Sequence, residues 1–121
     1  ALRAGIDVVK DGVRLRAIGE AIEAVVVPEG LSIVTEFGGH GIGRQMHLPP
    51  HVHHFAAPGP SPRLRAGMAI TIEPILCIGA PDIEFLDDGW TVVTKDRQWS
   101  AQFEHTLIVT RDGCDITTLP P

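Results

Sequence analysis

Three short stretches of the sequence each hold one side chain that could bind a metal ion. The candidates are His40 between two glycines, Glu73 in Thr-Ile-Glu-Pro, and Glu104 in Phe-Glu-His-Thr. One imidazole and two carboxylates form a nitrogen and oxygen ligand set, which suits divalent Mn, Fe, Co or Zn and needs no thiolate. Taken singly, each glutamate would be a rim or ion-paired strand residue and His40 a loop histidine. The three together predict a metal centre.

Alternation of apolar and polar residues predicts how Glu73 is presented. From Met68 to Cys77 the pattern has period two, so Thr71 and Glu73 share one face of a strand while Ile70 and Ile72 face the core. A carboxylate beside such apolar neighbours is costly to bury unless a cation or hydrogen bonds compensate it. The same period from residue 102 to 110 places Glu104 opposite its aromatic neighbour.

The elements that would position these residues follow the order helix, helix, strands. Apolar residues recur at helical spacing from Leu2 to Val9, and a second stripe of Leu15, Ile18, Ile22 and Val25 ends near Pro28 or Gly30. Strands are predicted at 31–37, 68–77, 90–94, 102–110 and 115–119, with hairpin turns at Asp88-Gly89 and Asp112-Gly113. This order predicts an α+β fold, with two helices packed on a mostly antiparallel sheet.

Glycine and proline set the expectations for residues 38–62. Glycines at positions 38, 39, 41 and 43 predict a loop that needs unusual backbone angles or a close backbone approach. Five prolines between Pro49 and Pro62 exclude a helix or a central strand, and predict an ordered surface excursion. We therefore expect His51, His53 and His54, which lie there, to be solvated. The alternative is that they chelate a metal ion together with His47.

The overall composition narrows the class of protein. The chain has 121 residues, enough for one domain, with 44% apolar and 21% charged residues and a net charge of −5. No run of Lys or Arg is present, which argues against a nucleic-acid partner. Two cysteines are too few for a disulfide framework, so a reducing cytoplasm is expected, and no apolar run is long enough for a membrane span. The chain starts inside an amphipathic helix without a Met, which predicts a fragment of a longer protein.

Four runs carry a resemblance to a known family. GGHGIGRQMHLPP, GMAITIEP, DGWTVVTKD and SAQFEHT resemble, in the same order, the signature blocks of type I methionine aminopeptidases. The related prolidases place an acidic residue after the last glutamate, where this chain has His105. The resemblance covers essentially all of residues 1–121 and implies the C-terminal half of a catalytic domain with the pita-bread fold, its N-terminal half being absent.

The resemblance also implies a role for each candidate residue. His40 and Glu73 would be terminal ligands of one ion, and Glu104 would bridge two divalent ions, Co, Mn, Fe or Zn, that hold a hydroxide as the nucleophile. Glu73 would also take the proton from the attacking water. His47 would donate a hydrogen bond to the scissile carbonyl. Trp90 would wall the methionine side-chain pocket, or, alternatively, would be a strand aromatic packed in the core.

The implied activity is removal of the initiator methionine from nascent proteins in the cytoplasm. The expected partners are the N-terminal Met of peptides and nascent proteins, the missing N-terminal half and the ribosome, with no membrane. The family's two aspartate ligands belong to that other half. The ligands here supply only two negative charges against four positive ones, so the chain alone is predicted to be inactive. The alternatives are a noncatalytic pita-bread relative that binds protein or RNA, and a prolidase-like peptidase.

Overall fold

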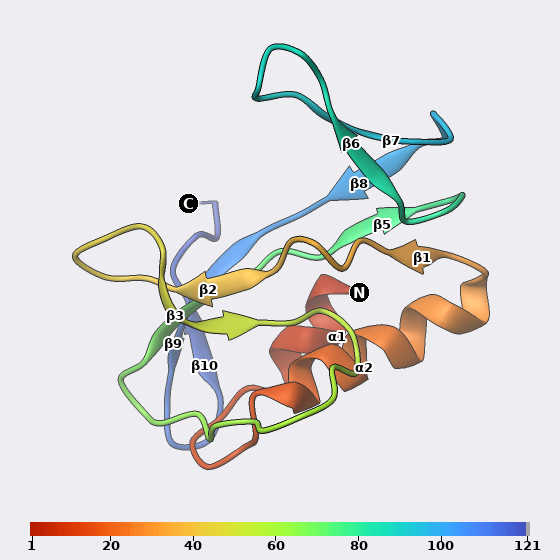
Figure 1. The fold of residues 1–121 in the computed structure, drawn as a ribbon. Coiled ribbons are helices and arrows are strands. Elements are labelled where there is room, and N and C mark those ends of the chain that lie inside the picture. Colours follow the sequence, from red (N-terminus) through yellow and green to blue (C-terminus); the bar gives the residue numbers. More distant parts are fainter. Residues whose placement is uncertain (121) are drawn as a thin grey trace.

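Short helices and strands make up the chain in the computed structural model, which describes residues 1–120 (Figure 1). The helices are α1 (Leu2–Asp7) and α2 (Arg16–Val26), followed by the 3-10 turn η1 (Val27–Glu29). The strands are β1 (Ser32–Ile33), β2 (Gly39–Gly41), β3 (Leu48–Val52), β4 (Ala69–Ile72), β5 (Ile75–Cys77), β6 (Ile83–Phe85), β7 (Val92–Thr94), β8 (Ser100–Gln102), β9 (His105–Val109) and β10 (Cys114–Ile116). The predicted α+β class is confirmed.

The core lies between the two helices and a five-stranded antiparallel sheet. Its strand order is β10-β9-β4-β2-β3, and α1 and α2 lie together against one side of it (Figure 1). The side chains of Ile18, Ile22, Ile70, Ile72 and Leu107 are fully buried there. Each such burial contributes about 1.5–3 kcal/mol to stability. Neither helix is both long and apolar enough to cross a membrane.

Helix α2 follows the predicted stripe except at its end. Ile18 and Ile22 face the core as expected, but Val25 is 44% exposed and Val26 takes the buried position. The i, i+4, i+8 row of Ile18, Ile22 and Val26 is therefore the true core stripe. The helix gives way to η1 and ends at Gly30, whose φ of 70° is left-handed, so the predicted stop is confirmed.

Two long strands predicted from the sequence are each broken in the middle. The stretch 68–77 splits at Glu73-Pro74 into β4 and β5, and the stretch 102–110 splits at Phe103-Glu104 into β8 and β9. Pro74 has no N–H and cannot extend the ladder. β4 pairs with β9 in the five-stranded sheet, whereas β5 pairs with β8 in a second sheet of order β1-β5-β8. Two neighbouring strands thus step together from one sheet to the other.

The glycine-rich segment is a strand and not the predicted loop. β2 lies between β4 and β3, and none of its glycines has a positive φ, so the expectation of unusual backbone angles was wrong. The expected close backbone approach is confirmed, because a Cβ added at Gly39 would overlap the carbonyl of Thr71, and one at Gly41 that of Pro49. β3 is an edge strand, the place in a sheet where proline is tolerated.

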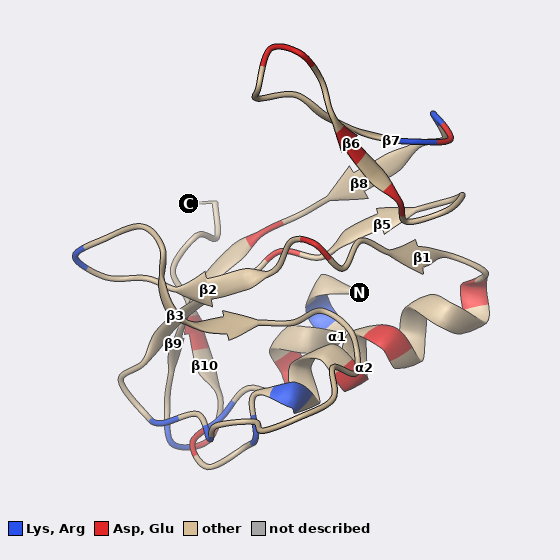
Figure 2. Ribbon diagram, in the orientation of Figure 1, with Lys and Arg blue, Asp and Glu red and all other residues tan. Residues whose placement is uncertain are grey.

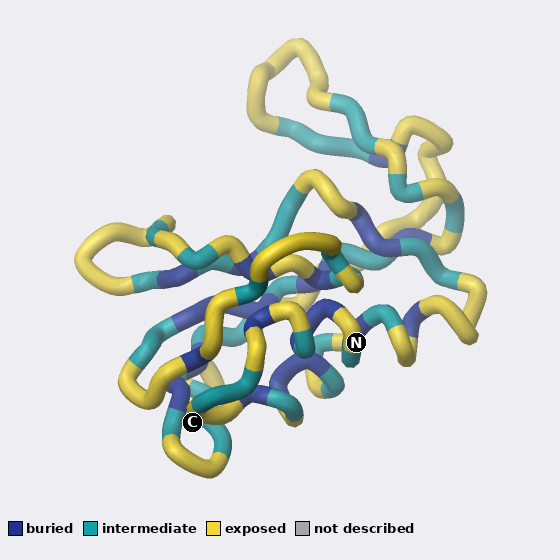
Figure 3. The backbone as a smooth tube through the Cα atoms, turned by 60° about the horizontal axis from the view of Figure 1, so that its bottom comes forward, coloured by how far each residue is buried: buried dark blue, intermediate teal, exposed yellow. Residues whose placement is uncertain are grey.

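The hairpin β6–β7 projects from the rest of the chain, with half-buried strands and an exposed tip (Figures 1 and 3). Its tip is the predicted turn at Asp88-Gly89, where Gly89 has a φ of 68° and the Asp88 carboxylate accepts hydrogen bonds from the backbone N–H groups of Trp90 and Thr91. The second predicted turn, at Asp112-Gly113, joins β9 to β10. Strand ends differ from the prediction by several residues, since the hydrophobic pattern extends beyond the hydrogen-bonded ladder.

Candidate metal centre

Three predicted ligands converge where the two strands change sheet. The potential ligand atoms of His40, Glu73 and Glu104 all lie within 4.8 Å of one another. His40 Nε2 is 3.4 Å from Glu73 Oε1. Two ligand atoms that are each about 2.1 Å from one ion, at a tetrahedral angle, lie roughly 3.4 Å apart. This spacing and this donor set therefore fit a divalent cation.

The local structure around His40 orients its ring for binding. Its backbone N–H donates to Thr71 Oγ1 at 3.0 Å, which ties β2 to β4. Its ring Nδ1 lies 2.9 Å from the carbonyl oxygen of Gly41. A carbonyl only accepts, so the proton resides on Nδ1 and the Nε2 lone pair faces Glu73.

Glu73 is held from both its side chain and its backbone. The Thr71 hydroxyl donates to Glu73 Oε1 at 2.8 Å, and the Glu73 backbone N–H donates to His54 Nε2 at 3.1 Å. Burial raises the pKa of the Glu73 carboxyl, and the Thr71 hydrogen bond works in the opposite direction. The nearby Glu104 carboxylate raises this pKa further. Such a crowded pair of carboxylates is what a bound cation would stabilise.

His54 is a supporting residue that the sequence analysis missed. Only 2% of it is exposed, and burial, followed by the charges of His51 and His53, lowers its pKa to about 4. The prediction that all three histidines are solvated is wrong for His54, whereas His51 and His53 are exposed. Alternation along the chain could have predicted this burial, because His54 lies two residues after Val52, which is buried on the inner face of β3.

A cleft of about 640 Å³ is lined in part by two of the candidate ligands, His40 and Glu73. His47 lines it with an exposed side chain, and its ring centroid lies 4.4 Å from that of His40. Phe37 and Ile75 supply an apolar part of the wall. The cleft is large enough for an amino-acid side chain, and the imidazole of His47 lies in it close to that of His40.

Trp90 does not join this group. It is 87% exposed at the tip of the β6–β7 hairpin and is not among the described residues that line the cleft. The alternative that it packs in the core is wrong, since the Asp88-Gly89 turn directs it into solvent.

Comparison with known proteins agrees with the geometry. The model of a protein family described as metallopeptidase family M24 matches residues 1–111. The chain belongs to this family. The family is described by its metallopeptidases, which agrees with a ligand set that fits a divalent cation.

Relatives of this M24 chain include methionine aminopeptidases. The methionine aminopeptidase of Salmonella typhimurium is 51% identical over 119 residues, which are 98% of this chain and 45% of the relative. Methionine aminopeptidase B of Synechocystis is 49% identical over 95% of this chain and 42% of its own length. The M24 chain thus spans about half the length of the curated relatives that it matches.

Solved structures confirm the fold. The crystal structure of methionine aminopeptidase from Rickettsia prowazekii matches with a TM-score of 0.93 and 42% identity, over 98% of this chain and 48% of that structure. The expected half of a pita-bread fold is therefore confirmed for the M24 chain.

Proposed function

We propose that residues 1–121 form the C-terminal half of a methionine aminopeptidase, which removes the initiator Met from nascent proteins. The observation that carries this proposal is the convergence of His40, Glu73 and Glu104 beside a cleft large enough for a methionine side chain. The sequence identity of 51% with a methionine aminopeptidase supports the choice of substrate.

The proposed cofactor is a pair of divalent ions, chosen from Mn, Fe, Co and Zn. His40 and Glu73 would hold one ion, and Glu104 would lie between the two. Bound ions of this kind polarise a peptide carbonyl and lower the pKa of water, so that water attacks at neutral pH. Imidazole and carboxylate ligands accept several first-row metals, so the ligand set does not select one of them.

The chain's own groups would handle the proton and the carbonyl. Glu73 would receive the proton of the attacking water on a carboxylate oxygen, a role for which its raised pKa is suited. His47 would donate a ring N–H to the carbonyl oxygen as negative charge develops, and a single donor of this kind contributes about 2.7–4 kcal/mol. Trp90 lies outside the cleft described above, so it would wall the methionine pocket only if the β6–β7 hairpin moved toward the cleft.

The rest of the active site would come from the N-terminal half. Two further aspartate ligands there would bring the charge balance that two ions need, because His40, Glu73 and Glu104 supply only two negative charges. The chain alone would therefore be inactive. The complete enzyme would act in the cytoplasm, on nascent chains at the ribosome.

A chimera tests this proposal. The segment of the Salmonella typhimurium enzyme that matches this chain would be replaced by the chain, and release of Met from Met-Ala-Ser would be measured with Mn or Co. We expect turnover by the chimera and none by the chain alone. No turnover would favour a noncatalytic binding module. Faster hydrolysis of X-Pro dipeptides would favour a prolidase-like enzyme, although His105 argues against that class.

The bridging role of Glu104 is tested in the same chimera. We expect Glu104→Ala to bind at most one ion and to lose more activity than the roughly 10–100-fold typical of outer-shell partners. Glu29→Ala, which removes an exposed carboxylate from η1, is the matched control and should keep both ions. Two ions bound per molecule in Glu104→Ala would refute the bridge.

A further inference from the structure

Most of the chain's positive charge lies at one end of the molecule. Three loop segments, 10–16, 61–67 and 109–113, carry six of the ten Lys and Arg residues and only two acidic residues, in a chain whose net charge is −5. Figure 2 shows these cations gathered at the end opposite the acidic β6–β7 hairpin. We call these six residues the basic end: Lys10, Arg14, Arg16, Arg63, Arg65 and Arg111. The sequence shows no run of cations because the fold, not the chain order, assembles this cluster.

Backbone hydrogen bonds fix the three segments against one another. The N–H of Gly12 donates to the carbonyl of Leu64 at 2.9 Å, and the N–H of Leu64 donates to Val13 at 2.8 Å. The N–H of Asp11 donates to Thr110 at 3.0 Å, joining the third segment. The backbone of the basic end is therefore preorganised, so binding needs no ordering of these three segments.

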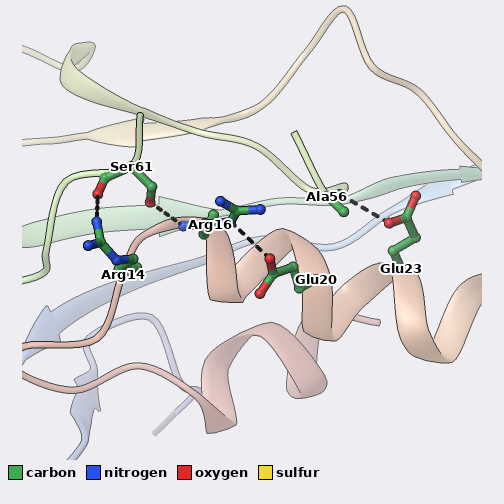
Figure 4. Close-up of polar contacts among 6 residues, drawn as sticks. All are labelled: Arg14, Arg16, Glu20, Glu23, Ala56 and Ser61. Carbon is green, nitrogen blue, oxygen red and sulfur yellow. Dashed lines mark hydrogen bonds and ion pairs between the residues drawn. The ribbon is translucent and has the colours of Figure 1, made fainter. Parts of the chain in front are cut away.

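Two arginines of the basic end lie directly opposite each other. An isolated antiparallel bridge pairs Arg14 with Arg63, and like charges in that position are destabilising. Each guanidinium is tied to a backbone carbonyl, Arg14 to Ser61 at 3.0 Å and Arg63 to Gly12 at 2.6 Å. Figure 4 shows that the Arg14 guanidinium and the Arg16 backbone N–H both donate hydrogen bonds to Ser61. The guanidinium groups of Arg14 and Arg63 each have further N–H donors that are not used in these hydrogen bonds. An anion bound between the two groups would relieve their mutual repulsion.

The remaining charges of the basic end are exposed and weakly compensated. Arg16 pairs with Glu20 at 2.9 Å, and Arg65 lies 3.9 Å from Asp11, a distance at which an exposed pair contributes little. Within residues 1–120, Lys10 and Arg111 make no ion pair. All six side chains belong to exposed residues.

The chemistry of the basic end selects one class of partner. Five of its six cations are arginines, whose planar donors match phosphate oxygens in pairs. Among the described residues, the large exposed apolar side chains, such as Trp90, Trp99 and Phe103, lie outside its three segments. It therefore offers neither an aromatic platform for unstacked bases nor an apolar wedge for a membrane. We infer that the basic end binds the phosphate backbone of double-stranded nucleic acid, without reading its sequence.

This inference stands apart from the metal centre. The metal centre is formed by β2 and by the strand breaks at Glu73 and Glu104, and none of the basic end belongs to those ligands. Binding of a duplex is therefore expected to survive His40→Ala, whatever the outcome of the peptidase test.

Fluorescence anisotropy with a labelled 20-base-pair DNA duplex tests the inference on the whole chain. Because about four phosphate contacts give a salt slope near −3.6, raising the salt from 50 to 200 mM should weaken binding by about 100-fold. The triple variant Lys10→Gln, Arg65→Gln, Arg111→Gln should bind at least tenfold more weakly at 50 mM salt. Its salt slope should also be shallower. The matched control, Arg3→Gln, Lys95→Gln, Arg97→Gln, removes the same charge elsewhere and should change the affinity less than threefold.

Three outcomes would overturn the inference. They are no binding of the duplex by the unaltered chain, equal losses in the two triple variants, and tighter binding to single-stranded DNA or anionic vesicles than to the duplex. Circular dichroism and thermal melting check that each variant is folded. If the triple variant is unfolded, Lys10→Gln with Arg111→Gln replaces it, since neither side chain makes an ion pair, and a loss of at least threefold is then expected.

Discussion

The five-stranded sheet and the β6–β7 hairpin are stabilised in different ways. In the sheet, Ile70, Ile72 and Leu107 are fully buried under the helices, whereas in the hairpin Phe85 is 63% and Trp90 87% exposed. The hairpin is held by its own ladder, by polar side chains at its turn and by an edge-to-face contact between Phe85 and Phe37. Apolar burial resists deformation throughout a layer, while short ladders on the surface open more easily.

The candidate ligands lie where the five-stranded sheet meets the three-stranded sheet β1-β5-β8, and not at the hairpin itself. His40 belongs to the buried sheet, and Glu73 and Glu104 lie where β4 and β9 leave it. The buried sheet thus sets the position of His40, and the break at Glu73-Pro74 brings Glu73 to the cleft. A site can thus be rigid on one side and accessible on the other.

The largest effect is expected from removing core volume. Ile72→Ala should lower the free energy of unfolding by about 4 kcal/mol, because it leaves a cavity beneath the helices. Phe85→Ala, in the hairpin, should lower it by less than about 1 kcal/mol. Urea unfolding of the chain measures both, and equal losses would remove the distinction between the two regions.

The second-largest loss of stability is expected when a methyl group is added where β2 contacts β4, beside His40. Gly39→Ala should lower the free energy of unfolding by about 3 kcal/mol, since the new Cβ would overlap the Thr71 carbonyl and push β2 away from β4. Gly113→Ala is the matched control, because no atom lies within 4 Å of a Cβ added there. A Gly39→Ala chain as stable as the control would contradict the close approach.

Protonation of His54 should give a smaller, pH-dependent loss. Its folded pKa of about 4 lies below the ordinary 6.5, so the stability it confers is complete above pH 6.5 and falls as the pH drops toward 4. At pH 4.5 the loss should be about 2.5 kcal/mol relative to pH 7.5.

The difference between the chain and a His54→Gln variant isolates this effect. The raised pKa of Glu73 acts in the opposite direction in both chains, and urea unfolding without metal measures the two. Parallel pH profiles for the two chains would show that His54 is not the group responsible.

The smallest effect on stability is expected at the hairpin tip. Trp90→Ala should change the free energy of unfolding by less than about 0.5 kcal/mol, because the side chain is 87% exposed. In the chimera, the same change should raise KM for Met-Ala-Ser if Trp90 walls the methionine pocket. An unchanged KM would remove Trp90 from the proposed pocket.

Much of this architecture could be predicted from periodicity alone. The helical stripe of α2, the two hairpin turns and the inward faces of β4 and β9 follow from local patterns that each residue type prefers. The strand breaks could not be predicted in the same way, because apolar alternation continues across Glu73-Pro74 while the hydrogen-bonding partner changes.

For the candidate site, the ligand residues could be predicted from the sequence, but the contacts that hold them in place could not. His40, Glu73 and Glu104 were identified from their flanking motifs, and the fold brings them together. The burial of His54 depends on β3 pairing with β2, a contact made by tertiary structure. The basic end was missed for the same reason, since its cations come from three distant segments.

The paired strand breaks have a consequence for engineering. Both glutamates lie at the step between two sheets, so the separation of their carboxylates depends on the angle between those sheets. Changing how the second sheet packs on the core, for example at Leu76 of β5, would alter that angle without touching a ligand. Preference for a smaller or larger ion could therefore be adjusted from outside the centre.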